Sequence, residues 1–434
     1  MSGLFVEYPI FLPLIYFFPS TDTGYVDVLV ARQAIFDRRR RVYGYELLFR
    51  SAAESNAFDG TEAAAATMQV LSNMLMSTGA TKLLGGKKAF INFDHHLLQE
   101  NMHLNLPQDS LVIELLESVV PTQDLLGLCR TIKKLGYTLA LDDFTDGPAF
   151  TPLAQMANVI KVDMRVSSPE EQERLLHVYQ PQGVMMLAEK VETYAEFEWA
   201  QRAGYDLFQG YFFARPETVR SQHISPITVA CLRLLREIQQ ADLDFRCLER
   251  HIRADVSLTY QLLRYANSAL FRCHAETQSI ARALVILGED GIRRWVALAT
   301  LPMLATDKPK ELVKLALVRA RFCEQLTVAR RSGLSNQAFL MGMFSLLDAL
   351  VDQPLAETLR GLDVGSEISE VLLGTAPEES FLNCLYQLTC CYELGKWDQV
   401  EVQSQRCGIQ AATIGEAYLD STVWADHAVH HVEA

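Results

Sequence analysis

Residues 138–163, TLALDDFTDGPAFTPLAQMANVIKVD, contain the pattern that decides the fold. A short apolar run ends at the acidic pair Asp142 and Asp143, and a second apolar run, VIKVD, carries Lys161 near its end. Short apolar runs separated by a longer polar segment are typical of buried strands in a parallel sheet. Each of these two strands therefore delivers ionisable side chains at its carboxyl end.

The same alternation extends to both sides of this segment. Further strand candidates are residues 26–36, 89–93, 111–115, 183–189 and 206–210. Amphipathic helical stretches lie between the strands, at residues 61–77, 123–135, 169–179 and 193–203. Strands that alternate with helices predict parallel α/β units, here closed into a (β/α)8 barrel.

Strand signals stop after about residue 216, and the second half of the chain has the pattern of consecutive helices. Apolar residues recur there at spacings of three and four, as in QAFLMGMFSLLDALV at residues 337–351. We therefore predict three parts. They are a poorly ordered leader at residues 1–25, a barrel domain at residues 26–216 and an all-α region at residues 217–434.

The composition is that of an ordinary globular protein, with 49% hydrophobic and 21% charged residues in a chain of 434. A formal net charge of −14 argues against duplex nucleic acid as a partner, because such binding depends on neutralising phosphates. Nine cysteines without a paired C-x-x-C spacing predict free thiols in a reducing cytoplasm. The apolar run at residues 8–18 is too short to cross a bilayer, so no transmembrane segment is predicted.

A polar side chain is predicted at the carboxyl end of each strand after the first. The set is Glu46, which follows the run RVYGY at residues 41–45, and Asn92, Glu114, Asp142, Asp143, Lys161, Glu189 and Gln209. Their mean spacing is close to the roughly 30 residues of one βαβ unit, so they should meet at one face of a closed barrel. A single strand-end Asp or Asn is more often a helix cap than a ligand, but the whole set in register predicts a functional site.

The side chains in this set indicate its chemistry. Several carboxylates gathered with an Asn and a Gln would repel one another unless divalent cations neutralise them, and oxygen-only ligation favours Mg²⁺ or Mn²⁺. Two such ions about 3.5–4 Å apart are the usual arrangement for phosphodiester hydrolysis. Lys161 would hold the attacking water or offset developing charge.

At these residues the chain resembles the EAL-domain family, cyclic di-GMP phosphodiesterases with a modified (β/α)8 TIM-like barrel. The motifs that carry the resemblance are YELLFR, FINF, IELLE, LALDDF, IKVD, AEKVE and FQGYFFARP. By the resemblance, two Mg²⁺ or Mn²⁺ ions are bound by Glu46, Asn92, Glu114, Asp142 and Asp143. The resemblance also implies hydrolysis of cyclic di-GMP to linear pGpG, and a homodimer.

The remaining site residues are also implied by the resemblance. Arg50 would grip a substrate phosphate, and Glu189 or Lys161 would activate water. Gln209 belongs to the same catalytic set, and Glu192 would steady the loop that follows Asp143.

Two departures from the family pattern keep other functions open. The family's DDFGTG loop is DDFTDG here, with Thr145 and Asp146 at its variant positions, and AEGVE is AEKVE. Lys190 beside Glu189 is expected to lower the basicity of that carboxylate if the side chains approach. The alternatives are a degenerate EAL receptor or scaffold that binds cyclic di-GMP or a protein partner without turnover, and a pair of interaction modules that never bind a nucleotide.

The helical half resembles the HDOD domain, a relative of the metal-dependent HD phosphohydrolases. The motifs LLRYANSALF and SIARALVILG carry this likeness. Leu347 stands where the HD enzymes have a metal-binding His, and Asp348 alone cannot assemble that site. The resemblance therefore implies a non-enzymatic HDOD domain, followed by a C-terminal helical extension, that passes a protein or ligand signal to the barrel. The tandem as a whole resembles the YuxH-like EAL-HDOD family.

Overall fold

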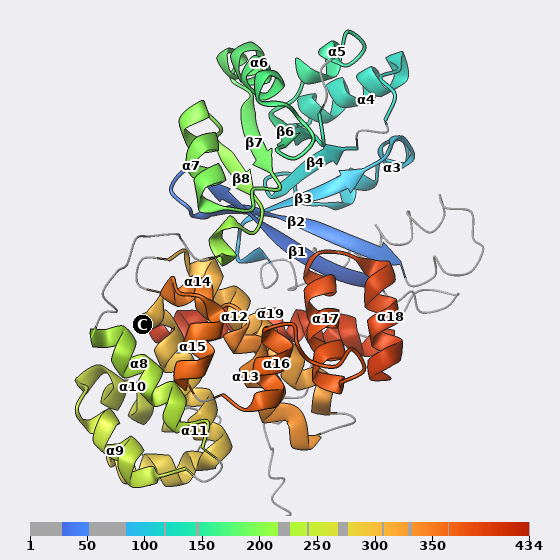
Figure 1. The fold of residues 1–434 in the computed structure, drawn as a ribbon. Helices are drawn as coiled ribbons and strands as arrows, with labels where there is room; N and C mark the ends of the chain where they lie inside the picture. The colour runs from blue at the N-terminus through green and yellow to red at the C-terminus, as the bar shows by residue number, and fades with distance from the viewer. Residues whose placement is uncertain are drawn as a thin grey trace, which may run out of the picture.

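A computed structural model describes residues 28–51, 84–116, 119–144, 147–215, 226–240, 243–267, 277–305, 308–328, 332–362 and 364–433. The described chain forms a closed eight-stranded barrel followed by a helical half, as Figure 1 shows. The predicted fold class, an α/β barrel followed by an all-α domain, is confirmed. The predicted leader, the predicted helix at residues 61–77, the variant residues Thr145 and Asp146 and most of the domain boundary lie outside the described residues.

The barrel has one strand that runs against the others. Its strands are β1 (Val28–Asp37), β2 (Val42–Ser51), β3 (Lys88–Phe93), β4 (Leu111–Leu115), β5 (Thr138–Leu141), β6 (Val159–Asp163), β7 (Met185–Glu189) and β8 (Leu207–Gln209). Strands β2 to β8 pair parallel with one another in sequence order, while β1 pairs antiparallel with both β2 and β8. The barrel is therefore a modified form of the all-parallel arrangement.

Short helices cover the outside of the barrel. They are α3 (His95–Gln99), α4 (Gln123–Lys134), α5 (Thr151–Ala154), α6 (Pro169–Tyr179) and α7 (Tyr194–Ala203). Local sequence explains where the longer ones begin, because Thr122, Ser168 and Thr193 each accept a hydrogen bond from a backbone N–H of the first turn. Starting each helix soon after its strand brings the chain back along the outside of the barrel to begin the next strand.

The helical half contains twelve helices within the described residues. They are α8 (Pro226–Glu237), α9 (Phe245–Arg253), α10 (Val256–Ala266), α11 (Ile280–Leu304), α12 (Lys310–Val328), α13 (Ser335–Phe344), α14 (Leu347–Val351), α15 (Leu355–Leu362), α16 (Ser366–Leu372), α17 (Phe381–Glu393), α18 (Trp397–Cys407) and α19 (Ala411–Glu433). None of the described helices is long and apolar enough to cross a membrane.

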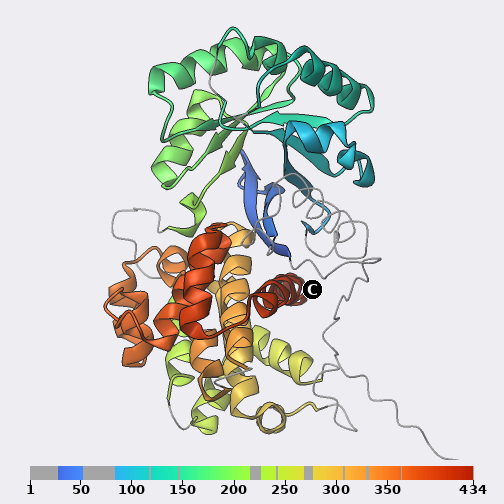
Figure 2. The ribbon, with the colours of Figure 1, turned by 90° about the vertical axis from the view of Figure 1, so that its right-hand side faces the viewer.

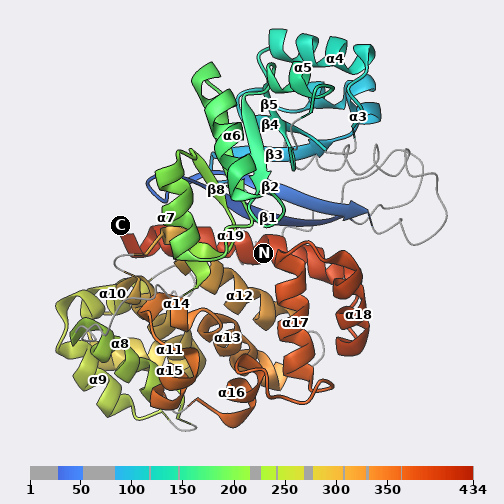
Figure 3. The ribbon, with the colours of Figure 1, turned by 45° about the horizontal axis from the view of Figure 1, so that its top comes forward.

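The β1–β2 hairpin joins the two halves of the molecule. It extends beyond the barrel and lies against the helices, as Figures 2 and 3 show for α17 and α19. Leu29 and Ala31 of β1 belong to the hydrophobic core of the helical half, whereas Val30 between them belongs to the barrel core. The hydroxyl of Tyr392 donates a 3.1 Å hydrogen bond to the carbonyl of Val30. Because side chains alternate along a strand, β1 contributes to both cores.

The length of β2 corrects one expectation from the sequence. Glu46 was predicted at the end of its strand, but β2 continues to Ser51. The cause is the long antiparallel pairing with β1, which runs from Ile35 opposite Gly44 to Val28 opposite Ser51. Glu46 therefore lies in the middle of β2.

Candidate functional site

The candidate site is a polar layer that lies above an apolar layer inside the barrel. The apolar layer consists of Ile35, Phe90, Val112, Ala140, Val159, Leu187 and Leu207. Two positions further along β3 to β8 stand Asn92, Glu114, Asp142, Lys161, Glu189 and Gln209. Side chains two residues apart lie on the same face of a strand, so the parallel strands lift all these groups into one layer. This is the face at which barrel enzymes carry their active sites.

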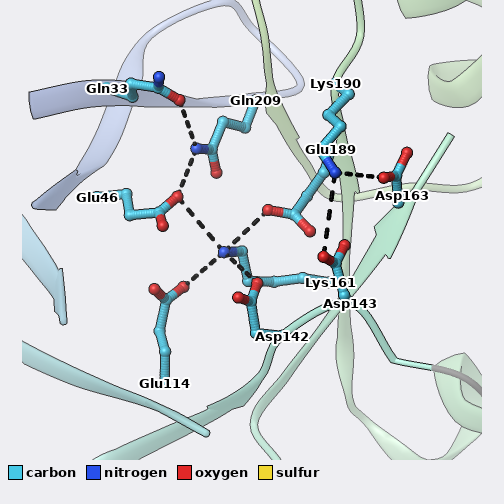
Figure 4. Close-up of polar contacts among 10 residues, drawn as sticks. All are labelled: Gln33, Glu46, Glu114, Asp142, Asp143, Lys161, Asp163, Glu189, Lys190 and Gln209. Carbon is cyan, nitrogen blue, oxygen red and sulfur yellow. Dashed lines mark hydrogen bonds and ion pairs between the residues drawn. The ribbon is translucent and has the colours of Figure 1, made fainter. Parts of the chain in front are cut away.

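Lys161 lies at the centre of the layer, surrounded by carboxylates (Figure 4). Its Nζ is 2.7 Å from Asp142 Oδ1, 2.9 Å from Glu189 Oε1 and 3.0 Å from Glu114 Oε1. A fourth carboxylate oxygen, Oε2 of Glu46, lies at 3.5 Å. The Lys161 side chain is only 1% exposed, so these charges interact in an environment that excludes most water.

A second set of contacts holds Glu46 from its other side. Gln209 Nε2 donates a 2.6 Å hydrogen bond to Glu46 Oε2 and a 3.2 Å hydrogen bond to Oε1 of Gln33. Gln33, on β1, donates in turn to the backbone carbonyl of Glu393 at the end of α17. Sequence reasoning missed Gln33, although it stands directly opposite Glu46 in the β1–β2 register. The strand register is the signal that could have revealed it.

Burial shifts the proton affinities of this cluster. Desolvation raises the pKa of Glu114 well above its ordinary value and that of Glu189 to about 8, although Lys161 opposes both shifts. Burial also disfavours the charge of Lys161, but the surrounding carboxylates, Glu114 first, outweigh it and raise the pKa of the ammonium well above its ordinary value. A pKa near neutrality allows Glu189 to exchange a proton at ordinary pH.

Several buried oxygens at this face have no hydrogen-bond partner. They are Asn92 Oδ1, Glu114 Oε2, Asp143 Oδ1, Glu189 Oε2 and Gln209 Oε1. Unpaired buried acceptors are costly, and this set, oxygen atoms alone, matches the ligands that Mg²⁺ and Mn²⁺ prefer. Within the described part of the chain, no group of three or more acidic, His or Cys side chains is gathered as a ready-made metal site. The donor atoms therefore fit a metal ion. Lys161 lies between the carboxylates that would bind this ion, so its ammonium must lie next to the metal.

Lys190 does not contact Glu189 as the sequence suggested. Its ammonium forms an ion pair with Asp163 and lies 4.0 Å from Asp143 Oδ2. The pKa of Glu189 is raised, because burial outweighs the opposing effect of its neighbouring cation, which is Lys161. The expectation that Lys190 reduces the basicity of Glu189 required the two side chains to approach, and Lys190 pairs with Asp163 instead, although its charge still attracts that of Glu189. Adjacent residues at a strand end point to opposite sides, which explains why Lys190 pairs elsewhere.

Arg50 and Glu192 lie outside the cluster around Lys161. Arg50 Nη1 is 2.6 Å from Oδ1 of Asp398, on α18 of the helical half. Glu192 Oε2 accepts a 3.0 Å hydrogen bond from Arg215. Of the predicted site residues, the structure brings into contact Glu46, Glu114, Asp142, Lys161, Glu189 and Gln209. Asn92 shares their layer without contacting Lys161 directly.

The part of the helical half that the structure describes contains no comparable cluster. Leu347 is fully buried among other apolar side chains, and Asp348 Oδ1 accepts a hydrogen bond from the backbone of the next residue. Burial raises the pKa of Asp348, which has no metal-binding partner among the described residues. These contacts make α14 a structural element of the core.

Comparisons with known proteins agree with this architecture. The family model of the EAL domain matches residues 29–216, and that of the HDOD domain matches residues 224–356. The fold and the site thus define a protein of the EAL class with an added HDOD domain. The chain is 35% identical over 411 residues to the cyclic di-GMP phosphodiesterase CdgJ of Vibrio cholerae serotype O1, with 94% of each chain covered.

A second relative extends this comparison. The uncharacterized protein YuxH of Bacillus subtilis is 32% identical over 407 residues, which cover 92% of this chain and 98% of YuxH. The chain therefore belongs to the family of tandem EAL-HDOD proteins to which these relatives belong.

Two solved structures similar to this chain each cover less than half of it. BlrP1 of Klebsiella pneumoniae in its calcium and cyclic di-GMP complex is 25% identical, covering 44% of this chain and 56% of BlrP1, with a TM-score of 0.35. A standalone EAL protein of Vibrio cholerae O395, bound to cyclic di-GMP, is 24% identical. That match covers 45% of this chain and 94% of the other, with a TM-score of 0.34.

Proposed function

We propose that this chain is a phosphodiesterase that hydrolyses cyclic di-GMP to linear pGpG. The observation that carries the proposal is the buried cluster of Lys161 with four carboxylates at the catalytic face of the barrel. The similarity to a cyclic di-GMP phosphodiesterase over nearly the whole chain supports this substrate. It favours an enzyme over a receptor or scaffold that binds without turnover, and over a pair of interaction modules.

The unpaired oxygens support a site for Mg²⁺ or Mn²⁺. The residues that would hold two ions are Glu46, Asn92, Glu114, Asp142 and Asp143. When bound, the ions supply a nucleophilic water at neutral pH and charge neutralisation at the phosphate.

The chain's own residues divide the remaining work. Glu189, with a pKa of about 8, takes a proton from the attacking water, and Lys161 holds that carboxylate and Asp142 in place. Gln209 fixes the orientation of Glu46 through its 2.6 Å hydrogen bond. Arg50 binds a substrate phosphate once it leaves Asp398, and Glu192 steadies the loop after Asp143.

The helical half regulates the barrel and has no turnover of its own. We assign the catalytic barrel domain to residues 26–216. The regulatory HDOD domain with its helical extension is assigned to residues 217–434. The regulatory input is a protein or ligand signal, and the assembly is a homodimer. Free thiols at every described cysteine support action in the reducing cytoplasm.

The proposal is tested by incubating purified protein with cyclic di-GMP and Mg²⁺ or Mn²⁺ and separating the products by chromatography. Linear pGpG is expected from the wild type, and its formation should be lost in Glu46→Gln, which preserves the shape of the side chain. Saturable binding of cyclic di-GMP without product would make the chain a receptor. Product formation that persists in Glu46→Gln would place the chemistry elsewhere.

A further inference from the structure

A second group of charges lies beside the Lys161 cluster and contains a lysine of its own. The ammonium of Lys190 pairs with Asp163 and lies 4.0 Å from Oδ2 of Asp143 (Figure 4). The other oxygen of Asp163 accepts a 2.7 Å hydrogen bond from the backbone N–H of Arg165. Both oxygens of Asp163 are therefore occupied, and the carboxylate anchors the lysine beside Asp143.

The backbone of Lys190 is fixed in an unusual conformation. Its φ of 54° lies in the left-handed region, which favours glycine and which only a few non-glycine residues adopt. The chain on either side is held, because Met164 N–H donates to the carbonyl of Glu189 and Val191 N–H donates to that of Gln209. The position thus retains a lysine where a glycine would meet the backbone requirement at lower cost.

The two groups differ in how many oxygen donors they offer to a metal ion. Four carboxylates, those of Glu46, Glu114, Asp142 and Glu189, surround Lys161. Only two carboxylates, those of Asp143 and Asp163, lie at Lys190, and its ammonium already pairs with Asp163. A divalent ion therefore meets more ligands at the first group than at the second.

From this arrangement we propose that Lys190 is a built-in cation that competes with a divalent metal ion for Asp143. The inference rests on the metal dependence in the proposed function and specifies how the two ions differ. One ion binds tightly at the Lys161 cluster, and a second ion binds weakly because it must displace the ammonium of Lys190. Displacement is sterically open, since the Lys190 side chain is 55% exposed and can move into solvent while Asp163 stays in place.

The test is titration of the metal-free full-length protein with Mn²⁺ by isothermal calorimetry, with bound metal counted by elemental analysis. The wild type should bind one ion tightly and a second more weakly. Lys190→Asn removes the charge with a residue that tolerates the left-handed conformation, so it should tighten the second ion by about tenfold and leave the first almost unchanged. Lys190→Arg keeps the charge and should behave as the wild type.

Arg165→Asn is the matched control, because it removes a neighbouring positive charge that pairs with Glu192 and Glu196 and leaves the Asp163 backbone contact intact. It should leave the affinity of both ions unchanged. The inference is overturned if Lys190→Asn leaves the second ion unchanged, if Arg165→Asn has the same effect, or if none of the proteins binds Mn²⁺. Hydrolysis of cyclic di-GMP is measured in a separate assay. If the proteins bind Mn²⁺ as predicted but form no pGpG, the proposed function is refuted and the inference about Lys190 stands.

Discussion

Gln33 is hydrogen-bonded across the junction of the two halves, because its Nε2 lies 3.3 Å from the backbone carbonyl of Glu393. The opposite end of the same amide accepts a hydrogen bond from Gln209, which also holds Glu46. A helix end in the helical half is thus connected to a carboxylate of the site through two glutamine side chains. We therefore expect a displacement of the end of α17 to disturb Glu46 through these hydrogen bonds.

The first prediction concerns this connection. Gln33→Ala should lower kcat by roughly tenfold, with a smaller change in KM, because Gln209 loses the partner that orients it toward Glu46. Steady-state kinetics with cyclic di-GMP measure the effect. The control is Gln180→Ala, which removes a comparable hydrogen bond to the carbonyl of Gly204 on the outside of the barrel. Equal losses in the two variants would argue against a role for Gln33 at the site.

The second prediction concerns Lys161, whose ammonium is shared by four carboxylates. Lys161→Met should lower turnover at least about 100-fold and destabilise the metal-free fold, because like charges then face each other in a buried site. Mn²⁺ should restore most of the melting temperature, since it replaces the missing charge. Lys134→Met, at the exposed end of α4, is the control. A variant that stays as stable as the wild type in EDTA would contradict the expectation.

The third prediction follows from the pKa of Glu189, which burial raises from 4.5 to about 8. The folded protein therefore keeps a proton that the unfolded chain releases between these values, and this contribution to stability is lost as the pH rises through about 8. Melting temperatures in EDTA should fall between pH 6 and pH 9, and less steeply in Glu189→Gln. Identical profiles for the two proteins would show that Glu189 does not carry the proton.

The fourth prediction concerns a buried ion pair in the helical half. Arg319 on α12 holds the carboxylate of Glu393 with Nε at 3.0 Å and Nη2 at 2.7 Å. Arg319→Met should cost about 3–5 kcal/mol of unfolding free energy, because it leaves Glu393 charged and buried. The double variant with Glu393→Leu should recover part of that loss. Urea unfolding of the single and double variants checks the expectation, which fails if their stabilities are equal.

The fifth prediction concerns Arg50 and its partner in the helical half. Asp398 is 92% exposed, so its ion pair with Arg50 should contribute less than about 1 kcal/mol to stability. Asp398→Ala should remove one competitor of the substrate for Arg50 and lower KM for cyclic di-GMP by a factor of about two to three, a small effect for a screened pair. Arg50→Ala should raise KM in both backgrounds. A KM that does not respond to Arg50→Ala would remove this residue from the substrate site.

The layer of site residues could be predicted from sequence because two simple periodicities determine it. Residues two apart share a strand face, and parallel strands end at the same rim of a barrel. Knowing where β3 to β8 lie is therefore enough to bring Glu114, Asp142, Lys161, Glu189 and Gln209 together.

The remaining features depend on pairings between distant parts of the chain. Gln33 lies within the antiparallel strand β1, so a search for polar residues at strand ends does not find it. Its acceptor is a backbone carbonyl of residue 393, which carries no side-chain signal. The partner of Arg50 lies 348 residues away, on a helix whose position follows from packing of the whole helical half. Local patterns contain no information about such contacts.

The hairpin that contributes to both hydrophobic cores changes where the molecule can be divided. In the gene, the obvious place to separate the halves is the segment between β8 and α8. A fragment cut there would retain the strand that carries Leu29 and Ala31 but lose the helices that cover these side chains. The excised barrel would expose the apolar side chains of the β1–β2 hairpin to solvent. It would therefore tend to aggregate. Recombination could therefore exchange the helical half only together with a hairpin whose side chains match its core. The helical half and the hairpin would have to be exchanged as one unit.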